Sequence, residues 1–233
     1  MQDNVTRHMA LVDLGVRLGA NLVVFPELSL TGYEPARAAE LSRFSNDSCL
    51  EGFQQLCDQN DVSIGVGFPL RTEGLPRISA LLFRPNSTPL IYSKRYLHPD
   101  EEPYFDSGTV ADSTIHSSPK VALAICYELS VPQHAQMAFD AGATAYIASV
   151  AKTARGIEDA SQQLSDIARQ NSALVMLSNC LGVHDGVECV GHSSAWDRKG
   201  KLLARLDSES DGVIVVDHDT GYVLTDSLTT TGQ

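Results

Sequence analysis

The sequence predicts a single α/β domain in which buried strands alternate with amphipathic helices. Short, nearly continuously apolar runs recur along the chain, as is typical of strands covered on both faces of a sheet. Between these runs, apolar residues recur at the three- and four-residue spacing of helices. The chain has 233 residues and 43% hydrophobic content. It is therefore long and apolar enough for one domain, residues 1–233, with a substantial core. The predicted strands cover residues 22–25, 64–68, 80–83, 121–125, 145–148, 174–177 and 213–216.

Three helices are predicted in the segments between these strands. They cover residues 8–19, residues 134–141, and a segment from about residue 158 to residue 171. Gly19 and Gly142 suit the ends of the first two helices, because glycine readily adopts the left-handed conformation found there. This alternation of strands and helices favours the α/β class.

Two strand–turn–strand patterns predict hairpins, so the sheets should be mixed rather than purely parallel. One has its loop at Pro85–Pro89, and the other turns within Trp196–Leu202. The chain opens almost directly into a helix, whereas an α/β pattern usually begins with a strand. We therefore expect a first strand to be missing at the N-terminal end, and a polar tail from about Thr225 to Gln233.

Charge and hydropathy argue against two classes of partner. The formal net charge is −12 and no Lys/Arg cluster offsets it, so a nucleic-acid backbone would be repelled. No segment approaches the roughly 18 apolar residues of a membrane span. The polar start of the chain has no secretory signal peptide. We expect neither a nucleic-acid partner nor a membrane partner.

The cysteines indicate a reducing compartment. Their odd number and irregular spacing do not resemble a disulfide framework, and no pair has the close spacing of a structural zinc site. We therefore expect a cytoplasmic protein. The five cysteines are Cys49, Cys57, Cys126, Cys180 and Cys189.

Three polar residues lie where predicted strands end, which is where ligand sites form in α/β folds. Glu27 follows the first predicted strand, and Lys94 follows the hairpin loop. Cys126 closes a third strand, at a turn that leads into a helix. A helix N-terminus there would favour the thiolate, and the Tyr127 backbone N–H could face a developing oxyanion.

The order and spacing of three motifs resemble the nitrilase superfamily of carbon–nitrogen hydrolases. The likeness extends from about Asn4 to Asp217 and includes two later segments, 178–182 and 191–197 with Gly200. The three motifs are Phe25-Pro26-Glu27 with Thr31-Gly32-Tyr33, Tyr92-x-Lys94 with Leu97, and Cys126-Tyr127-Glu128. A fourth likeness, Glu101-x-x-x-Phe105-x-x-Gly108, follows the Lys94 motif.

The resemblance implies a four-layer α-β-β-α sandwich of two mixed sheets that pairs into a homodimer. It also implies a Glu–Lys–Cys triad in which Glu27 is the general base, Lys94 stabilises the oxyanion and Cys126 is the nucleophile. No metal or organic cofactor is required. Glu101 would orient Lys94 or the substrate, although Glu102 is one residue away and could take that role.

Two further roles and several substrates stay open. Glu128 is a weaker candidate for holding the Lys94 ammonium or the turn at Cys126. A small amide is the preferred substrate, with a nitrile, a carbamoyl amide or acyl transfer as alternatives. A catalytically silent binding protein of the same fold is another possibility, and so is a Cys–His hydrolase that pairs Cys126 with His192 or His184.

The chain departs from the family at two segments that border the substrate in other members. Leu129–Pro132 stands where many members carry Arg-Phe-Pro-Glu-like residues. Ser149–Thr153 replaces a frequent Asn-Pro-Trp-type stretch. The resemblance therefore predicts the type of bond attacked but not the molecule that carries it.

Overall fold

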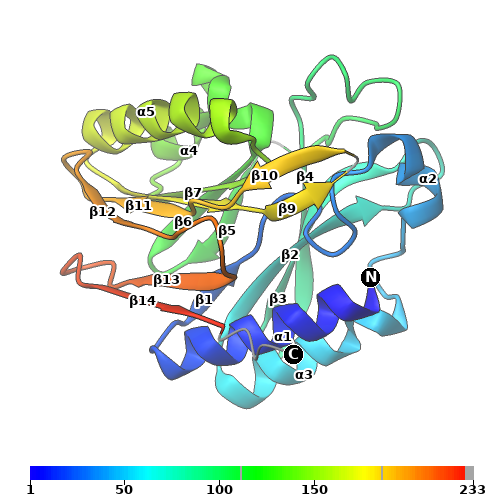
Figure 1. The fold of residues 1–233 in the computed structure, drawn as a ribbon, viewed down its shortest axis with the longest axis horizontal. Coiled ribbons are helices and arrows are strands. Elements are labelled where there is room, and N and C mark those ends of the chain that lie inside the picture. The colour runs from blue at the N-terminus through cyan, green and yellow to red at the C-terminus, as the bar shows by residue number, and fades with distance from the viewer. Residues whose placement is uncertain (111, 185, 229–233) are drawn as a thin grey trace.

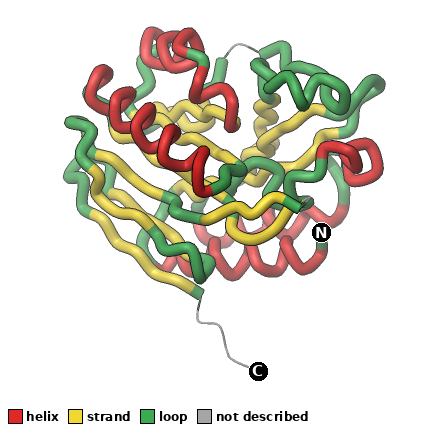
Figure 2. Tube along the Cα trace, turned by 45° about the horizontal axis from the view of Figure 1, so that its top comes forward, coloured by secondary structure: helices red, strands yellow, loops and turns green. Residues whose placement is uncertain are grey.

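Two β-sheets stack face to face, and helices cover the outer face of each (Figures 1 and 2). The computed structural model describes residues 1–110, 112–184 and 186–228. Three clusters of buried side chains fill the spaces between these layers, one between the sheets and one under each pair of helices. The α/β class and the four-layer arrangement of mixed sheets are thus confirmed.

The first sheet has four strands, and its outer face is covered by α1 (Gln2–Arg17) and α3 (Glu51–Asn60). Its first two strands are parallel and the others antiparallel. In spatial order the strands are β1 (Leu22–Val24), β2 (Ser63–Leu70), β3 (Arg77–Arg84) and β4 (Ser87–Ser93).

The second sheet has six strands, and its outer face is covered by α4 (Pro132–Asp140) and α5 (Ala154–Asn171). Three neighbouring strands, which cover residues 120–125, 145–150 and 174–179, are parallel to one another. The carboxyl ends of these three strands therefore meet at one edge of the sheet. In spatial order the strands are β12 (Leu202–Arg205), β11 (Ser194–Trp196), β8 (Leu174–Asn179), β7 (Ala145–Val150), β6 (Lys120–Ile125) and β5 (Thr114–Ser117).

Two separate hairpins and four short helices complete the described chain. The hairpins are β9 (Leu181–His184) with β10 (Val187–Val190), and β13 (Gly212–Val216) with β14 (Val223–Ser227). The short helices are η1 (Pro35–Arg37), α2 (Ala38–Leu41), η2 (Ser48–Leu50) and η3 (Cys126–Ser130). Among the residues described, no helix combines the length and hydropathy needed to cross a bilayer.

All seven predicted strands and all three predicted helices exist, but several boundaries differ. Helices α1 and α5 begin earlier than predicted, because their polar first turns carry little apolar periodicity. Gly19 and Gly142 follow α1 and α4 with φ of 89° and 90°, as expected. The loop predicted at Pro85–Pro89 is shorter, because Asn86 adopts φ 50° and closes a tight turn, so that β4 starts at Ser87.

The polar tail was predicted to begin too early. Thr225, Asp226 and Ser227 belong to β14, where backbone pairing with β13 outweighs their polar composition. Leu228 follows β14, and residues 229–233 of the predicted tail lie outside the described residues.

A cavity of about 1020 Å³ lies between β1 and β13. Within the described chain, β1 pairs only with β2 and β13 only with β14. The cavity is lined by every residue of β1 and β13, by α1 and by the inner face of the second sheet. The Asn4 side-chain amide donates to the Leu30 carbonyl at 3.0 Å, so α1 begins beside the end of β1. The expected first strand stays a prediction.

Candidate active site

The three strand-end residues predicted from the sequence come together between the two sheets. Glu27 follows β1, Lys94 follows β4, and Cys126 follows β6. The Ser149 hydroxyl, at the end of β7, donates to the Phe25 carbonyl at 2.8 Å and so ties the two sheets together at this point. In addition, a Cβ at position 67 would lie 2.5 Å from the Pro26 carbonyl oxygen, so Gly67 allows the Glu27 segment to lie against β2.

Lys94 is the centre of a buried charge cluster. Its side chain is fully buried, and Nζ donates to Glu27 Oε1 at 2.8 Å and to Glu101 Oε1 at 2.6 Å. Burial alone would lower the pKa of Lys94, but attraction to Glu27, Cys126 and Glu101 outweighs it and raises the pKa. Lys94 is therefore a fixed cation at neutral pH.

Glu27 has one oxygen engaged and one available. Oε1 accepts from Lys94, whereas Oε2 is buried and has no well-formed hydrogen bond among the described residues. Burial raises the pKa of Glu27, although Lys94 opposes this effect. The neighbouring Cys126 thiol also opposes the rise, so Glu27 lies beside the sulfur. A carboxylate in this position can exchange a proton with a neighbouring group.

Cys126 occupies a strained turn, as expected for a residue at a strand-to-helix junction. It opens η3 with φ 45°, a left-handed conformation that is uncommon for a residue with a side chain. Burial raises the pKa of its thiol to about 12, and the negative charge of Glu27 acts in the same direction. The thiol is therefore protonated at neutral pH and needs a base to act as a nucleophile.

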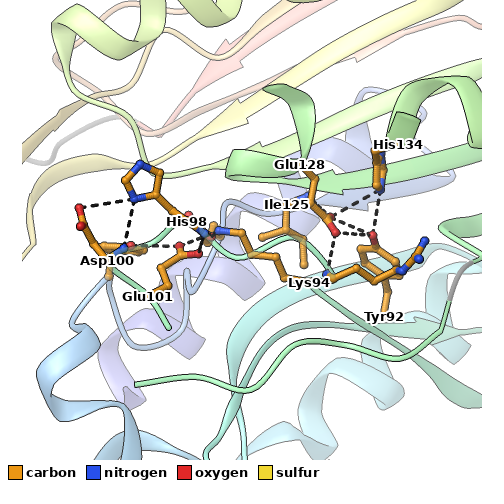
Figure 3. Close-up of polar contacts among 11 residues, drawn as sticks. Tyr92, Lys94, His98, Asp100, Glu101, Ile125, Glu128 and His134 are labelled. Carbon is orange, nitrogen blue, oxygen red and sulfur yellow. Dashed lines mark hydrogen bonds and ion pairs between the residues drawn. The ribbon is translucent and has the colours of Figure 1, made fainter. Parts of the chain in front are cut away.

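The choice between Glu101 and Glu102 is settled by burial. Glu101 is 1% exposed, whereas Glu102 is exposed. Besides Lys94, Glu101 accepts from the Tyr33 hydroxyl at 3.0 Å. It also accepts from the His98 backbone N–H at 2.8 Å (Figure 3). Glu101 is thus the glutamate that pairs with Lys94, and Glu102 is exposed.

Glu128 holds the turn rather than the Lys94 ammonium. Its carboxylate accepts from the Ile125 N–H at 2.9 Å and from the Arg95 N–H at 2.7 Å. The Tyr92 hydroxyl donates to the same carboxylate, as Figure 3 shows. Glu128 therefore links the residue before Cys126 to the residue after Lys94, and among the described residues it makes no ion pair with Lys94.

Sequence reasoning missed the support behind Glu128. His134 Nε2 lies 2.9 Å from the Tyr92 hydroxyl, and its Nδ1 lies 2.8 Å from the Tyr146 hydroxyl. Burial lowers the pKa of His134 to about 4, so the ring is neutral and relays hydrogen bonds between the two tyrosines. Tyr92 belongs to the Tyr92-x-Lys94 motif, but no motif contains His134 or Tyr146. These two residues meet because α4 packs on the second sheet.

Among the described residues, the predicted alternative base His192 makes no hydrogen bond with Cys126. Its backbone N–H donates to the Asp207 carbonyl at 3.4 Å. The side chain of His184 lies outside the described residues. The described part of the chain also holds no cluster of three or more His, Cys, Asp or Glu residues suited to a metal ion.

Comparison with known proteins identifies the class. A sequence profile of the carbon-nitrogen hydrolase family matches residues 1–225. The chain belongs to this family and is a carbon–nitrogen hydrolase, as the motifs predicted.

Individual relatives agree with this assignment. An (R)-stereoselective amidase from Pseudomonas sp. is 26% identical over 185 residues, which cover 78% of this chain and 68% of the relative. A probable nitrilase from Schizosaccharomyces pombe is 24% identical over 83% of this chain and 74% of its own. A double mutant of the amidase from Nesterenkonia sp. AN1, solved in complex with acrylamide, superposes with a TM-score of 0.81 at 19% identity, covering 97% of this chain and 84% of that one.

Proposed function

We propose that the protein hydrolyses small amides through a thioester on Cys126, with Glu27 as the general base and Lys94 as the oxyanion-stabilising cation. The observation that carries this proposal is the asymmetry of Glu27. One of its oxygens is held by Lys94 at 2.8 Å, and the other is buried without a well-formed hydrogen bond beside a protonated thiol. That arrangement suits a proton transfer from sulfur to carboxylate.

The first half-reaction forms the carbon–sulfur bond. Glu27 takes the thiol proton while Sγ attacks the amide carbon, and the carbonyl π electrons move onto oxygen. The Lys94 ammonium and the Tyr127 N–H stabilise that oxyanion, an effect worth roughly 3–4 kcal/mol per donor. Glu27 then gives the proton to the leaving nitrogen, the carbon–nitrogen bond breaks, and ammonia or an amine departs.

The second half-reaction regenerates the thiol. Water loses a proton to Glu27 and attacks the thioester carbon, and the same two donors stabilise the second oxyanion. The carbon–sulfur bond then breaks, the proton passes from Glu27 to sulfur, and the carboxylic acid leaves. Throughout the cycle Lys94 keeps its charge, because its raised pKa prevents it from losing a proton to Glu27.

A nitrile is a second candidate substrate, because the same thiol can add to a nitrile carbon and form a thioimidate that water hydrolyses. The similarity to a probable nitrilase favours testing it. An ammonia-release screen over short aliphatic amides, carbamoyl amines and aliphatic nitriles separates these substrates. A catalytically silent protein would release ammonia from none of them.

Cys126→Ala tests the assignment of the nucleophile. We expect this variant to lose amide turnover while it keeps the melting temperature of the parent protein, because alanine removes only the sulfur. Cys49→Ala is the matched control, since Cys49 is also a half-buried free thiol but contacts the Met1 sulfur. Retained hydrolysis in Cys126→Ala would overturn the proposal.

We also propose that the enzyme acts as a cytoplasmic homodimer. Homodimerisation is supported by the superfamily resemblance, and a reducing compartment by the five free cysteines. Size-exclusion chromatography with light scattering measures the assembly, and a monomer at micromolar concentration contradicts the dimer.

A further inference from the structure

A second lysine, Lys152, lies beside the nucleophile. Strand β7 runs parallel to β6 with Ile125 opposite Ser149, so the residues that follow β7 lie next to Cys126. Ala151 follows β7 and lies beside the Cys126 thiol, and Lys152 is the next residue along the chain. The charge of Lys152 also lowers the pKa of Cys126, as a nearby cation should.

The backbone of Lys152 is held rigidly. Its N–H donates to Asn179 Oδ1 at 2.8 Å, and its carbonyl accepts from Asn179 Nδ2 at 3.1 Å. Asn179 is 6% exposed and also donates to the Gly191 carbonyl at 2.7 Å. The aliphatic stem of Lys152 lies along the first turn of α5, since a Cβ on Gly156 would be 3.7 Å from it. The lysine thus starts from a fixed position at the rim of the site.

The ammonium of Lys152 has no partner within the described chain. Lys94 is paired with Glu27 and Glu101, whereas Lys152 is half-buried and makes no ion pair or side-chain hydrogen bond with any described residue. The N-terminus of α5 adds positive potential at the same place, because Thr153 provides no side-chain cap and the first turn has no acidic residue. The site therefore has one cation for chemistry and a second one that is unpaired.

We propose that Lys152 binds a carboxylate of the substrate, so that the preferred amides are ω-amides with a free carboxylate, the monoamides of short dicarboxylic acids. This inference rests on the proposed amide hydrolysis at Cys126. The amide carbonyl enters between Cys126 and Lys94, and the distal carboxylate pairs with Lys152. An uncharged amide of the same length uses the same triad but lacks that contact.

The test compares two matched substrate pairs, succinamate with butanamide and glutaramate with pentanamide. The wild-type protein should hydrolyse at least one charged amide with a higher kcat/KM than its neutral counterpart. Lys152→Gln should reduce kcat/KM for that charged amide about tenfold more than for the neutral one, mainly through KM, as expected for a lost substrate contact. Lys152→Arg, which keeps the charge, should restore most of the preference.

Two controls make the outcome unambiguous. Lys201→Gln removes a lysine from the exposed turn between β11 and β12 and should leave both substrates unaffected. Added salt should weaken the preference of the wild-type protein for the charged amide, because the contact is an ion pair near solvent.

Three results overturn the proposal. They are no preference for either charged amide in the wild-type protein, an equal loss on both members of a pair in Lys152→Gln, and an unchanged preference in that variant. Failure of the underlying function looks different, because neither charged nor neutral amides would then be hydrolysed in a Cys126-dependent manner.

Discussion

Two buried glutamates, Glu27 and Glu128, differ in how completely their carboxylates are hydrogen-bonded. Both are at most 2% exposed, and burial raises the pKa of each. Glu128 accepts hydrogen bonds from two backbone N–H groups and a tyrosine hydroxyl. Glu27 accepts from Lys94 alone and leaves its second oxygen without a well-formed bond.

The difference indicates which carboxylate can exchange a proton. Leaving a buried polar atom without a partner costs about 1–3 kcal/mol, and native proteins keep few such atoms outside functional sites. Glu128 has its partners in the folded protein and gains nothing from a substrate. Within the described chain, Glu27 lacks a hydrogen-bond donor for Oε2. A thiol, a leaving amine or a water molecule can each donate to that oxygen in turn.

Replacing Glu27 gives the largest expected effect. Glu27→Gln keeps the shape of the side chain but cannot act as a base, so kcat should fall by about 10²–10⁴-fold. The free energy of unfolding should stay level or rise, because a buried carboxylate with an unmet oxygen is removed. Steady-state ammonia release and urea denaturation measure the two quantities. Wild-type turnover in this variant would favour a different base for Cys126.

The matched substitution at Glu128 should have the opposite pattern, with a loss of stability and a smaller loss of activity. Glu128→Gln turns one acceptor oxygen into a donor that faces the Ile125 or Arg95 N–H. The unfolding free energy should therefore drop by about 1–3 kcal/mol, with kcat reduced less than in Glu27→Gln. If urea denaturation shows no loss of stability, the carboxylate does not hold the Cys126 turn.

The hydrogen-bond relay behind Glu128 predicts a pH dependence of stability. The pKa of His134 lies at about 4 in the folded protein against an ordinary 6.5, so its contribution is fully present above pH 6.5. Between these values the unfolded chain binds a proton that the folded protein does not, and stability falls with decreasing pH by up to roughly 1.4 kcal/mol per unit.

His134→Gln isolates this contribution. The slope of unfolding free energy against pH, measured by denaturation between pH 4 and 6.5, should be smaller in the variant than in the wild-type protein. His8, whose pKa burial also lowers to about 4, keeps its own contribution in both proteins. Equal slopes in the two proteins would mean that His134 is not buried as a neutral ring.

The smallest effect is expected at Tyr33. Tyr33→Phe removes one hydrogen bond to Glu101, which keeps Lys94 and the His98 N–H as partners. If the hydrogen bond contributes about 1 kcal/mol net, its removal lowers kcat/KM several-fold. Glu102→Gln is the control and should have no effect, since Glu102 is exposed. A larger loss for Glu102→Gln than for Tyr33→Phe contradicts the placement of Glu101.

The proximity of Glu27, Lys94 and Cys126 could be predicted from the sequence because these residues sit at strand ends and in ordered motifs. Glu27 and Cys126 each follow an apolar run, and Lys94 follows the strand after the hairpin loop. The succession of apolar runs also indicates the fold class. Glu101 and Glu102 could not be separated, because one position along a loop decides burial and no periodicity reports it.

Other features depend on contacts that no local pattern encodes. The pairing of His134 with Tyr146 requires α4 to dock on the second sheet. The free oxygen of Glu27 and the unpaired ammonium of Lys152 are properties of the assembled site. The order of strands within each sheet likewise follows from packing rather than from any one run.

The most direct test of the central claim is to trap the acyl group on the enzyme during turnover. The protein is mixed in excess with a short amide, quenched with acid within the first turnover, digested and analysed by mass spectrometry. We expect one acyl group on the peptide that contains Cys126, removable by hydroxylamine as a thioester should be, and absent from Cys126→Ala. An acyl group on any other residue, or amide hydrolysis by Cys126→Ala, would contradict the account.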